Sequence, residues 1–302
     1  MIKREQYMRR IRPFIGSELV KVMTGIRRSG KSVMLELVKD ELVESGVDSA
    51  NFISINFEDM RYGHLLNAQA LHDHVMGLAG QMSGKVYLFF DEIQEVADWE
   101  RCINSFRVAL DCDIYITGSN AKLLSGELAT YLGGRYVEFV IYPFSFGEFM
   151  ELYRTIEPEA TDAKCFQKYL LSGGMPYLAN LRYEDAPSRQ YLTDLFNSVQ
   201  LKDIVKRNKV RDVDLLERII AYVMANVGTT FSASPLVKFF RNDERTVATE
   251  TILNYLLFCS DAFLLFQVKR QDLQGKQILA TNEKCYIADH DIREFQLMPE
   301  WI

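Results

Sequence analysis

The sequence is poor in cysteine and histidine, and their spacing argues against two kinds of site. The five cysteines are odd in number, widely separated and without a C-x-x-C pair, so they predict neither a disulfide framework nor a structural zinc site. Of the four histidines, His72 and His74 are two apart and would point in different directions on a helix. Neither residue type predicts a metal centre.

Long apolar runs and a strong charge of one sign are also missing. The N-terminal residues carry charges throughout, unlike a signal peptide. The most apolar later stretch, 252–268, is interrupted by Asn254, Ser260 and Asp261 and is too short and polar to span a membrane. A net charge of −6 gives no general attraction to nucleic acid or anionic membrane. We therefore expect a cytoplasmic globular protein of 302 residues with room for two domains.

The first half of the sequence alternates between strand-like and helical patterns. Apolar or alternating segments predict strands at 19–24, 51–57, 86–90, 113–117 and 135–141, and helical patterns lie between them at 32–46, 68–82 and 99–110. This alternation predicts a parallel α/β sheet with right-handed crossovers. In such a sheet ligands bind beyond the C-terminal ends of the strands.

The turn after the first strand matches G-x-x-x-x-G-K-[ST] in full. Its residues are Gly25, Ile26, Arg27, Arg28, Ser29, Gly30, Lys31 and Ser32. Glycine lets the backbone wrap so that successive N–H groups face one anion, and the next helix presents its N-terminus to the phosphates. We expect Lys31 to reach the β- and γ-phosphates and Ser32 to bind Mg²⁺. The pattern therefore predicts a nucleoside triphosphate site, with ATP and Mg²⁺ as its ligands.

Two adjacent acids, Asp91 and Glu92, follow the apolar strand 86–90. Carboxylates at the end of a buried strand are costly without a cationic partner, which Mg²⁺ would supply. We expect Asp91 to hold Mg²⁺ and Glu92 to act as general base on the attacking water. The alternative is that the pair caps the next helix.

Further site candidates follow the later strands. Thr117, Ser119 and Asn120 could contact the γ-phosphate or the attacking water, or could instead form a helix N-cap. Arg135 could act as an arginine finger on a neighbouring subunit, or could be a structural ion-pair partner. Arg27 and Arg28 occupy variable positions of the loop and could face the phosphates, the nucleobase or only solvent.

After residue 153 helices predominate. Helices are predicted at 165–172, 191–207, 214–226, 234–241 and 246–258, and strands at 263–268 and at 277–278 with 284–287. Three helices followed by a β-ribbon give the outline of a winged helix. DNA binding is weakly supported, because residues 206–302 hold 13 basic and 13 acidic residues and the third helix begins near Asp243 and contains Glu250. The basic stretch Lys202–Arg211 contacts DNA or forms a solvated helix face.

Several motifs in one order resemble the AAA+-type P-loop ATPases found in bacteria and archaea as ATP-binding proteins with a C-terminal domain of unknown function. These motifs are GIRRSGKS, NFED, LFFDEIQ, ITGSN, GGRY, PFSFGEF, GGMP and KDIVKRNKVRD. The resemblance implies that Lys31, Ser32, Asp91 and Glu92 form the nucleotide site. It also implies that the strand at 113–117 lies between the P-loop strand and the Asp-Glu strand. Members of that family usually continue into a nuclease-like domain, so we expect a truncated tail here.

We accordingly expect an ATPase core at 1–155, a helical lid or linker at 156–205, a winged-helix-like domain at 206–294 and a truncated tail at 295–302. The leading hypothesis is a Mg²⁺-dependent ATP hydrolase that couples nucleotide state to domain rearrangement or to remodelling of an unknown protein partner, with homo-oligomerisation possible and no membrane contact. The alternatives are a DNA-associated ATPase and a non-catalytic nucleotide-binding scaffold.

Overall fold

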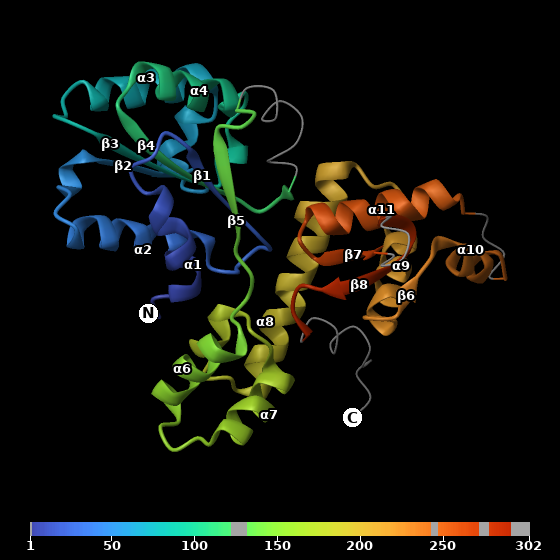
Figure 1. Cartoon of the computed structure of the whole chain (residues 1–302). Coiled ribbons are helices and arrows are strands. Elements are labelled where there is room, and N and C mark those ends of the chain that lie inside the picture. Colours follow the sequence, from blue (N-terminus) through green and yellow to red (C-terminus); the bar gives the residue numbers. More distant parts are fainter. Residues whose placement is uncertain (1, 122–131, 243–246, 272–277, 291–302) are drawn as a thin grey trace. The chain divides into compact units, whose positions relative to one another are not determined.

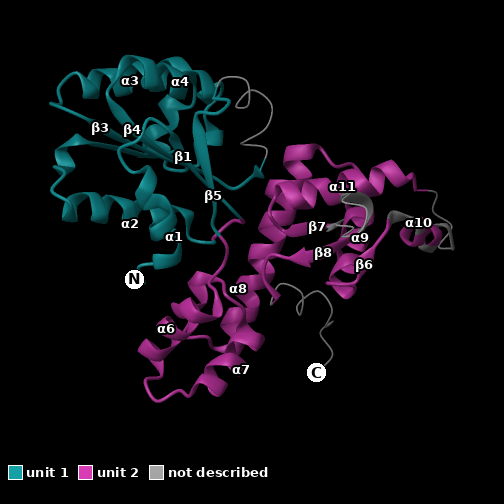
Figure 2. Cartoon of the chain, viewed as in Figure 1, with its two compact units in different colours: residues 1–25, 29–141 teal, residues 26–28, 142–302 magenta. Residues whose placement is uncertain are grey.

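The structure is a computed structural model that describes residues 2–121, 132–242, 247–271 and 278–290. Its contacts divide the chain into two units (Figure 2). Unit 1 comprises Met1–Gly25 and Ser29–Ile141, and unit 2 comprises Ile26–Arg28 and Tyr142–Ile302. The expected domain limits at 155 and 205 stay a prediction, and the predicted tail at 295–302 lies outside the described residues.

Unit 1 is built on a five-stranded parallel sheet in the order β2-β3-β4-β1-β5. The strands are β1 (Val20–Thr24), β2 (Phe52–Asn56), β3 (Val86–Asp91), β4 (Cys112–Gly118) and β5 (Tyr136–Val140). Strand β4 pairs with both β1 and β3, which confirms the predicted insertion between the P-loop strand and the Asp-Glu strand. All five strands run the same way, so their C-terminal ends share one edge.

Helices cover both faces of this sheet (Figure 1). Among the described residues of unit 1, the α-helices are α1 (Glu5–Ile11), α2 (Lys31–Glu44), α3 (Ala68–Ala79) and α4 (Trp99–Ala109). Along β3, Leu88 and Phe90 pack in one core with α3 and α4, whereas Phe89 packs in the other with α1 and α2. Alternate side chains of a strand point to opposite faces, and here both faces are apolar because both are covered. The sheet therefore forms a rigid base for the loops at its C-terminal edge.

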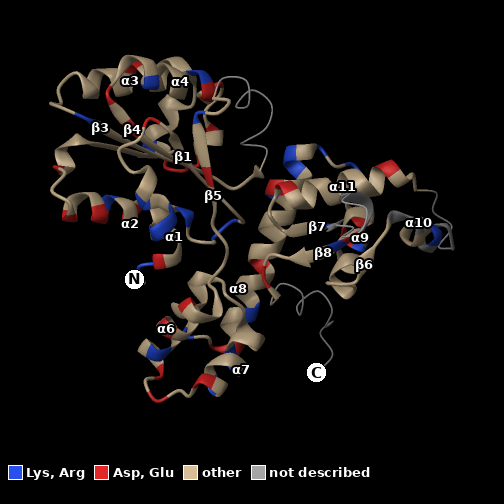
Figure 3. Cartoon of the chain, viewed as in Figure 1, with Lys and Arg blue, Asp and Glu red and all other residues tan. Residues whose placement is uncertain are grey.

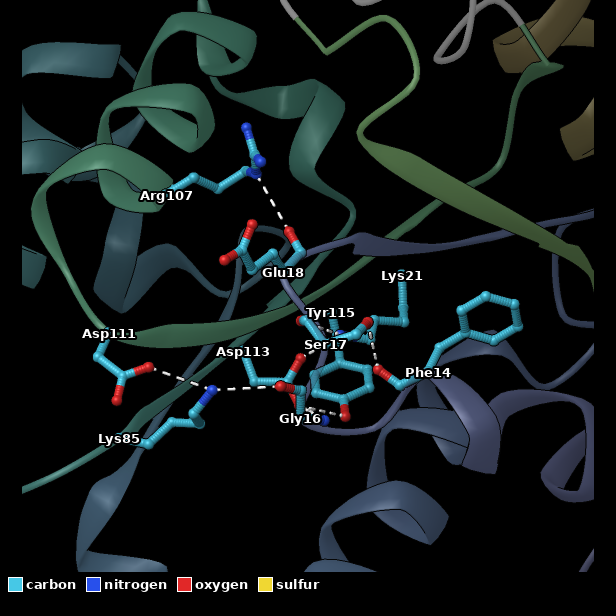
Figure 4. A network of polar contacts seen from close by, with 10 residues as sticks. All are labelled: Phe14, Gly16, Ser17, Glu18, Lys21, Lys85, Arg107, Asp111, Asp113 and Tyr115. Carbon is cyan, nitrogen blue, oxygen red and sulfur yellow. Dashed lines mark hydrogen bonds and ion pairs between the residues drawn. The ribbon is translucent and has the colours of Figure 1, made fainter.

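A buried polar network lies at the opposite edge, where β1 and β4 begin (Figure 4). Lys21 of β1 and Asp113 of β4 form an ion pair, and both side chains are fully buried. Asp113 also accepts hydrogen bonds from the backbone N–H of Gly16 at 2.7 Å and from the Tyr115 hydroxyl at 2.8 Å. Lys21 Nζ donates to the carbonyl oxygen of Ser17 at 3.0 Å. The network joins the segment before β1 to the centre of the sheet.

The first part of unit 2 is helical. Its helices are α6 (Phe146–Ile156), α7 (Asp162–Ser172) and α8 (Asp185–Ser198), and α8 continues into a π-helical segment at Val199–Lys206. The sequence reading missed α6, although Ser145 and Glu148 form a capping box at its start. The predicted helix 191–207 begins earlier, at Asp185. Pro187 does not prevent this, because it falls in the first turn, where a missing N–H costs little.

The second part of unit 2 combines three helices with a small antiparallel sheet. The helices are α9 (Val213–Ala225), α10 (Ala233–Asn242) and α11 (Thr249–Asp261), and the strands β6 (Thr230–Phe231), β7 (Leu265–Gln271) and β8 (Ile278–Ile287) pair in the order β6-β8-β7. The winged-helix assignment stays a prediction. Positions of acidic and of basic residues both occur along the ribbon of this unit (Figure 3). Within the described ranges, no helix is both long enough and apolar enough to cross a membrane.

Candidate nucleotide-binding site

The loop after β1 has a backbone that requires glycine at both ends. Gly25 has φ 140°, and a Cβ atom on it would lie 2.2 Å from the carbonyl oxygen of Ile141. Gly30 has φ 98° and forms the N-cap of α2. Side chains at these two positions would force the backbone to move. The start of α2 thus faces the loop with its backbone N–H groups, as an anion site requires.

Lys31, the first residue of α2, is buried at the C-terminal edge of the sheet. Its Nζ donates to the carbonyl oxygen of Gly25 at 3.1 Å and lies 3.9 Å from Oε1 of Glu92. The ammonium is therefore held beside the loop and beside the predicted general base. Ser29 is also buried, and its Oγ has no hydrogen-bond partner among the described residues.

Asp91 ends β3 and is held by side chains from three other elements. Its Oδ1 accepts from Thr117 Oγ1 at 2.5 Å, and its Oδ2 accepts from Asn56 Nδ2 at 3.0 Å. Burial raises the pKa of Asp91, whereas hydrogen bonds from Thr117 and Ser32 lower it. A cation at this position would favour the ionised form. The structure thus brings Ser32 and Asp91 together, and their hydroxyl and carboxylate oxygens suit Mg²⁺.

Glu92 adopts a left-handed backbone conformation, with φ 55° and ψ 49°. Its N–H donates to Thr117 Oγ1 at 2.9 Å, so Thr117 contacts both acids at once. Gln94 Nε2 donates to Glu92 Oε2. Glu92 also occupies the N-cap position of the next helix, the 3₁₀ helix Ile93–Glu95, but its side chain makes no capping hydrogen bond there. Asp98, and not the acidic pair, is the N-cap of α4.

The other candidates lie in different places. Ser119 and Asn120 follow β4 and are buried, and Ser119 Oγ finds no hydrogen-bond partner in the described part of the chain. Their alternative role as a helix N-cap concerns the residues that follow, and 122–131 lie outside the described ranges. Arg135 precedes β5, at the edge opposite the phosphate loop, and its Nη1 lies 3.5 Å from Asn104 Oδ1. Its role as an arginine finger stays a prediction.

The middle of the loop, Ile26–Arg28, groups with unit 2. Arg27 Nε lies 3.1 Å from Oδ2 of Asp203, a buried residue in the π-helical segment. Arg28 has φ 66°, and its charge lowers the pKa of Tyr191, which burial raises. The contact between Arg27 and a carboxylate was not predicted from the sequence.

Sequence reasoning missed three residues that hold the site in place. Asn56 and Gln94 belong to the motifs NFED and LFFDEIQ, so the sequence indicated that they lie near the site. Their contacts with Asp91 and Glu92 could not be predicted from it. Arg4 gave no signal beyond its charge, yet it is buried and its Nη1 donates to the carbonyl oxygen of Ser29 at 2.9 Å.

Two known families cover most of the chain. Residues 17–150 match the family described as AAA domain, and residues 163–298 match a domain of unknown function, DUF8612.

Two curated relatives extend over nearly the whole chain. An uncharacterized protein of Haemophilus influenzae is 37% identical over 97% of this chain and 73% of its own length. The uncharacterized protein MJ1544 of Methanocaldococcus jannaschii is 31% identical over 89% of this chain and 60% of its own length. Both relatives are thus longer than this chain.

Solved structures show more distant similarity. AMPPCP-bound DnaA from Aquifex aeolicus is 13% identical with a TM-score of 0.42, covering 85% of this chain and 88% of that one. The ORC2 protein of Aeropyrum pernix is 10% identical with a TM-score of 0.44, covering 94% of this chain and 87% of that one. The sequence matches and the sheet topology show that the chain belongs to the AAA+-type P-loop ATPase family with a C-terminal domain of unknown function.

Proposed function

We propose that this protein binds ATP with Mg²⁺ and hydrolyses it, and that the nucleotide state changes the arrangement of its two units or remodels a protein partner. One observation carries the proposal. The buried ammonium of Lys31, the buried carboxylate of Asp91 and the carboxylate of Glu92 meet beside a glycine-bounded loop at the start of α2.

Each of these residues has a distinct part in the proposed reaction. The backbone N–H groups at the start of α2 and Lys31 bind the phosphates. Ser32 and Asp91 would hold Mg²⁺, which when bound supplies positive charge to the phosphate oxygens. Glu92 accepts a proton from the attacking water, and Thr117 fixes the acids relative to each other by contacting both of them. Ser119 and Asn120, buried at the same edge, are proposed to sense the γ-phosphate.

The test is phosphate release by the wild-type protein and by Glu92→Gln, with Mg²⁺ and saturating ATP. Removing a general base lowers kcat by about 10²–10⁴-fold. We expect Glu92→Gln to lose hydrolysis and keep its affinity for ATP, because its amide preserves the size of the side chain. Equal turnover by both proteins, with ATP bound, would instead indicate a nucleotide-binding scaffold.

DNA association is a second candidate, favoured by the exposed basic residues around the π-helical segment. Lys202, Lys206, Lys209 and Arg211 are exposed within ten positions of one another. If this stretch binds duplex, DNA will stimulate hydrolysis, and the stimulation will fall steeply with salt as counterions are released. An ATPase rate that does not respond to duplex DNA at low salt would remove this candidate.

A further inference from the structure

Gln94 contacts the proposed general base. Its Nε2 donates to Oε2 of Glu92. The other carboxylate oxygen, Oε1, lies 3.9 Å from Lys31 Nζ, on the side of the phosphate loop. One oxygen is therefore occupied by the Gln94 amide while the other faces the place where the phosphates are expected.

This contact depends on an unusual backbone. Side chains two residues apart on a regular helix do not face each other, so Glu92 and Gln94 would ordinarily diverge. The left-handed conformation of Glu92, with φ 55°, turns the chain so that they meet. A non-glycine residue in this conformation is strained, and such strain persists only where the surrounding structure enforces it. Strained residues of this kind cluster at functional sites.

The short 3₁₀ helix Ile93–Glu95, which carries Gln94, is fixed to the core on both sides. Ile93 is fully buried, and Val96, directly after the helix, is 2% exposed. The backbone N–H groups of Glu95 and Val96 donate to the carbonyl oxygens of Glu92 and Ile93 at 3.1 and 3.0 Å. The Gln94 amide is thus held on a rigid support rather than on a mobile loop.

The second polar atom of Gln94, the buried Oε1, has no hydrogen-bond partner among the described residues. A buried acceptor without a donor is costly, so a water molecule is the expected donor. The Gln94 amide would then donate to Glu92 and accept from a water molecule. Glu92 and a water molecule are the two partners of the proposed proton transfer, so one side chain would hold both.

We propose that Gln94 is a positioning residue for hydrolysis, holding the Glu92 carboxylate toward the phosphate loop through its Nε2 and ordering a water through its Oε1. This inference rests on the proposed function, because it assigns Gln94 to the same reaction. It concerns the rate of the chemical step and not the binding of ATP, since Gln94 donates its hydrogen bond to Glu92, the proposed general base.

The experiment compares Gln94→Leu, Gln94→Glu and Gln81→Leu with wild type. Leucine removes both polar groups at similar size, and glutamate keeps the shape but cannot donate to Glu92 when ionised. Gln81 is exposed in the turn that follows α3, so Gln81→Leu is the matched control. Three readouts are needed: kcat for phosphate release, the Kd of a fluorescent ATP analogue, and the thermal midpoint of the nucleotide-free protein.

We expect both Gln94 variants to lower kcat by about 10–100-fold, the usual effect of losing a group that orients a site residue. The Kd for the analogue should stay within about twofold of wild type, the thermal midpoint should be unchanged, and the control should match wild type throughout. Wild-type kcat in Gln94→Leu would overturn the inference and leave the proposed function standing. A parallel loss of nucleotide affinity or thermal midpoint would overturn it in favour of a structural role. Wild-type turnover no faster than Glu92→Gln would remove the proposed function and this inference together.

Discussion

The buried pair of Lys21 and Asp113 leads to a sharp prediction about stability. Replacing Lys21 by methionine keeps most of the side-chain volume but leaves Asp113 as an uncompensated buried charge. Gly16 and Tyr115 still donate to this carboxylate, but their neutral hydrogen bonds do not replace a cation. Breaking one partner of a buried pair costs about 3–5 kcal/mol. For a unit of this size that lowers the unfolding temperature by about 10–15 °C.

The neighbouring Lys85 provides a matched control within the same network. It pairs with Asp111 at 3.1 Å, but their side chains are 31% and 71% exposed, so water screens the interaction. We expect Lys85→Met to cost less than about 1 kcal/mol. The double variant Lys21→Met/Asp113→Asn removes both charges of the buried pair while keeping an acceptor for Gly16 and Tyr115. It should recover about 2 kcal/mol relative to Lys21→Met alone.

Urea unfolding followed by tryptophan fluorescence measures these differences. The chain has two tryptophans, and Trp99 is buried in unit 1. A Trp301→Phe background leaves Trp99 as the only reporter. Two results would refute this prediction. One is a loss of unfolding free energy in Lys21→Met that is no larger than in Lys85→Met. The other is a double variant whose loss equals the sum of the losses in Lys21→Met and in Asp113→Asn.

Three further predictions concern local geometry. Gly25→Ala should weaken ATP binding at least ~10-fold, measured by titration with a fluorescent analogue, because the new Cβ would lie 2.2 Å from the carbonyl oxygen of Ile141. Arg4→Met should raise the Kd for ATP about 5–10-fold in the same titration, because the Ser29 carbonyl loses a charged donor. Ser145→Ala should lower the free energy of unfolding of unit 2 by about 1 kcal/mol in urea, because the capping box of α6 is lost.

The sheet and the phosphate loop were predictable because their signals are local. Apolar strands of the right length alternate with helical periods, and the P-loop pattern combines glycines, a lysine and a hydroxyl at fixed spacing. The same locality explains why Asp91 and Glu92 could be placed at the C-terminal edge of the sheet, because they stand at the end of an apolar strand. Their roles in hydrolysis stay a prediction.

The contacts that orient the site could not be predicted in this way. Arg4 reaches Ser29 across 25 positions, and Thr117 reaches the acidic pair from a neighbouring strand. The link from Gln94 to Glu92 needs a left-handed backbone at a glutamate, which no propensity favours. Strand β6 has only two residues, too few for a periodic pattern. The helix α6 differs from these contacts, because its capping box of Ser145 and Glu148 is a local signal from which the helix could have been predicted.

Binding of ATP to the wild-type protein and to Lys31→Ala, in the presence of Mg²⁺, decides whether the loop Gly25–Ser32 is the nucleotide site. Lys31 is buried beside Gly25 and Glu92, and we propose that its ammonium meets the phosphates there. Loss of a charged donor to two phosphates corresponds to about 3 kcal/mol, or ~100-fold in Kd. We predict saturable binding by wild type and affinity at least ~100-fold weaker in the variant. Equal affinity in the two proteins would contradict the assignment of this loop as the nucleotide site.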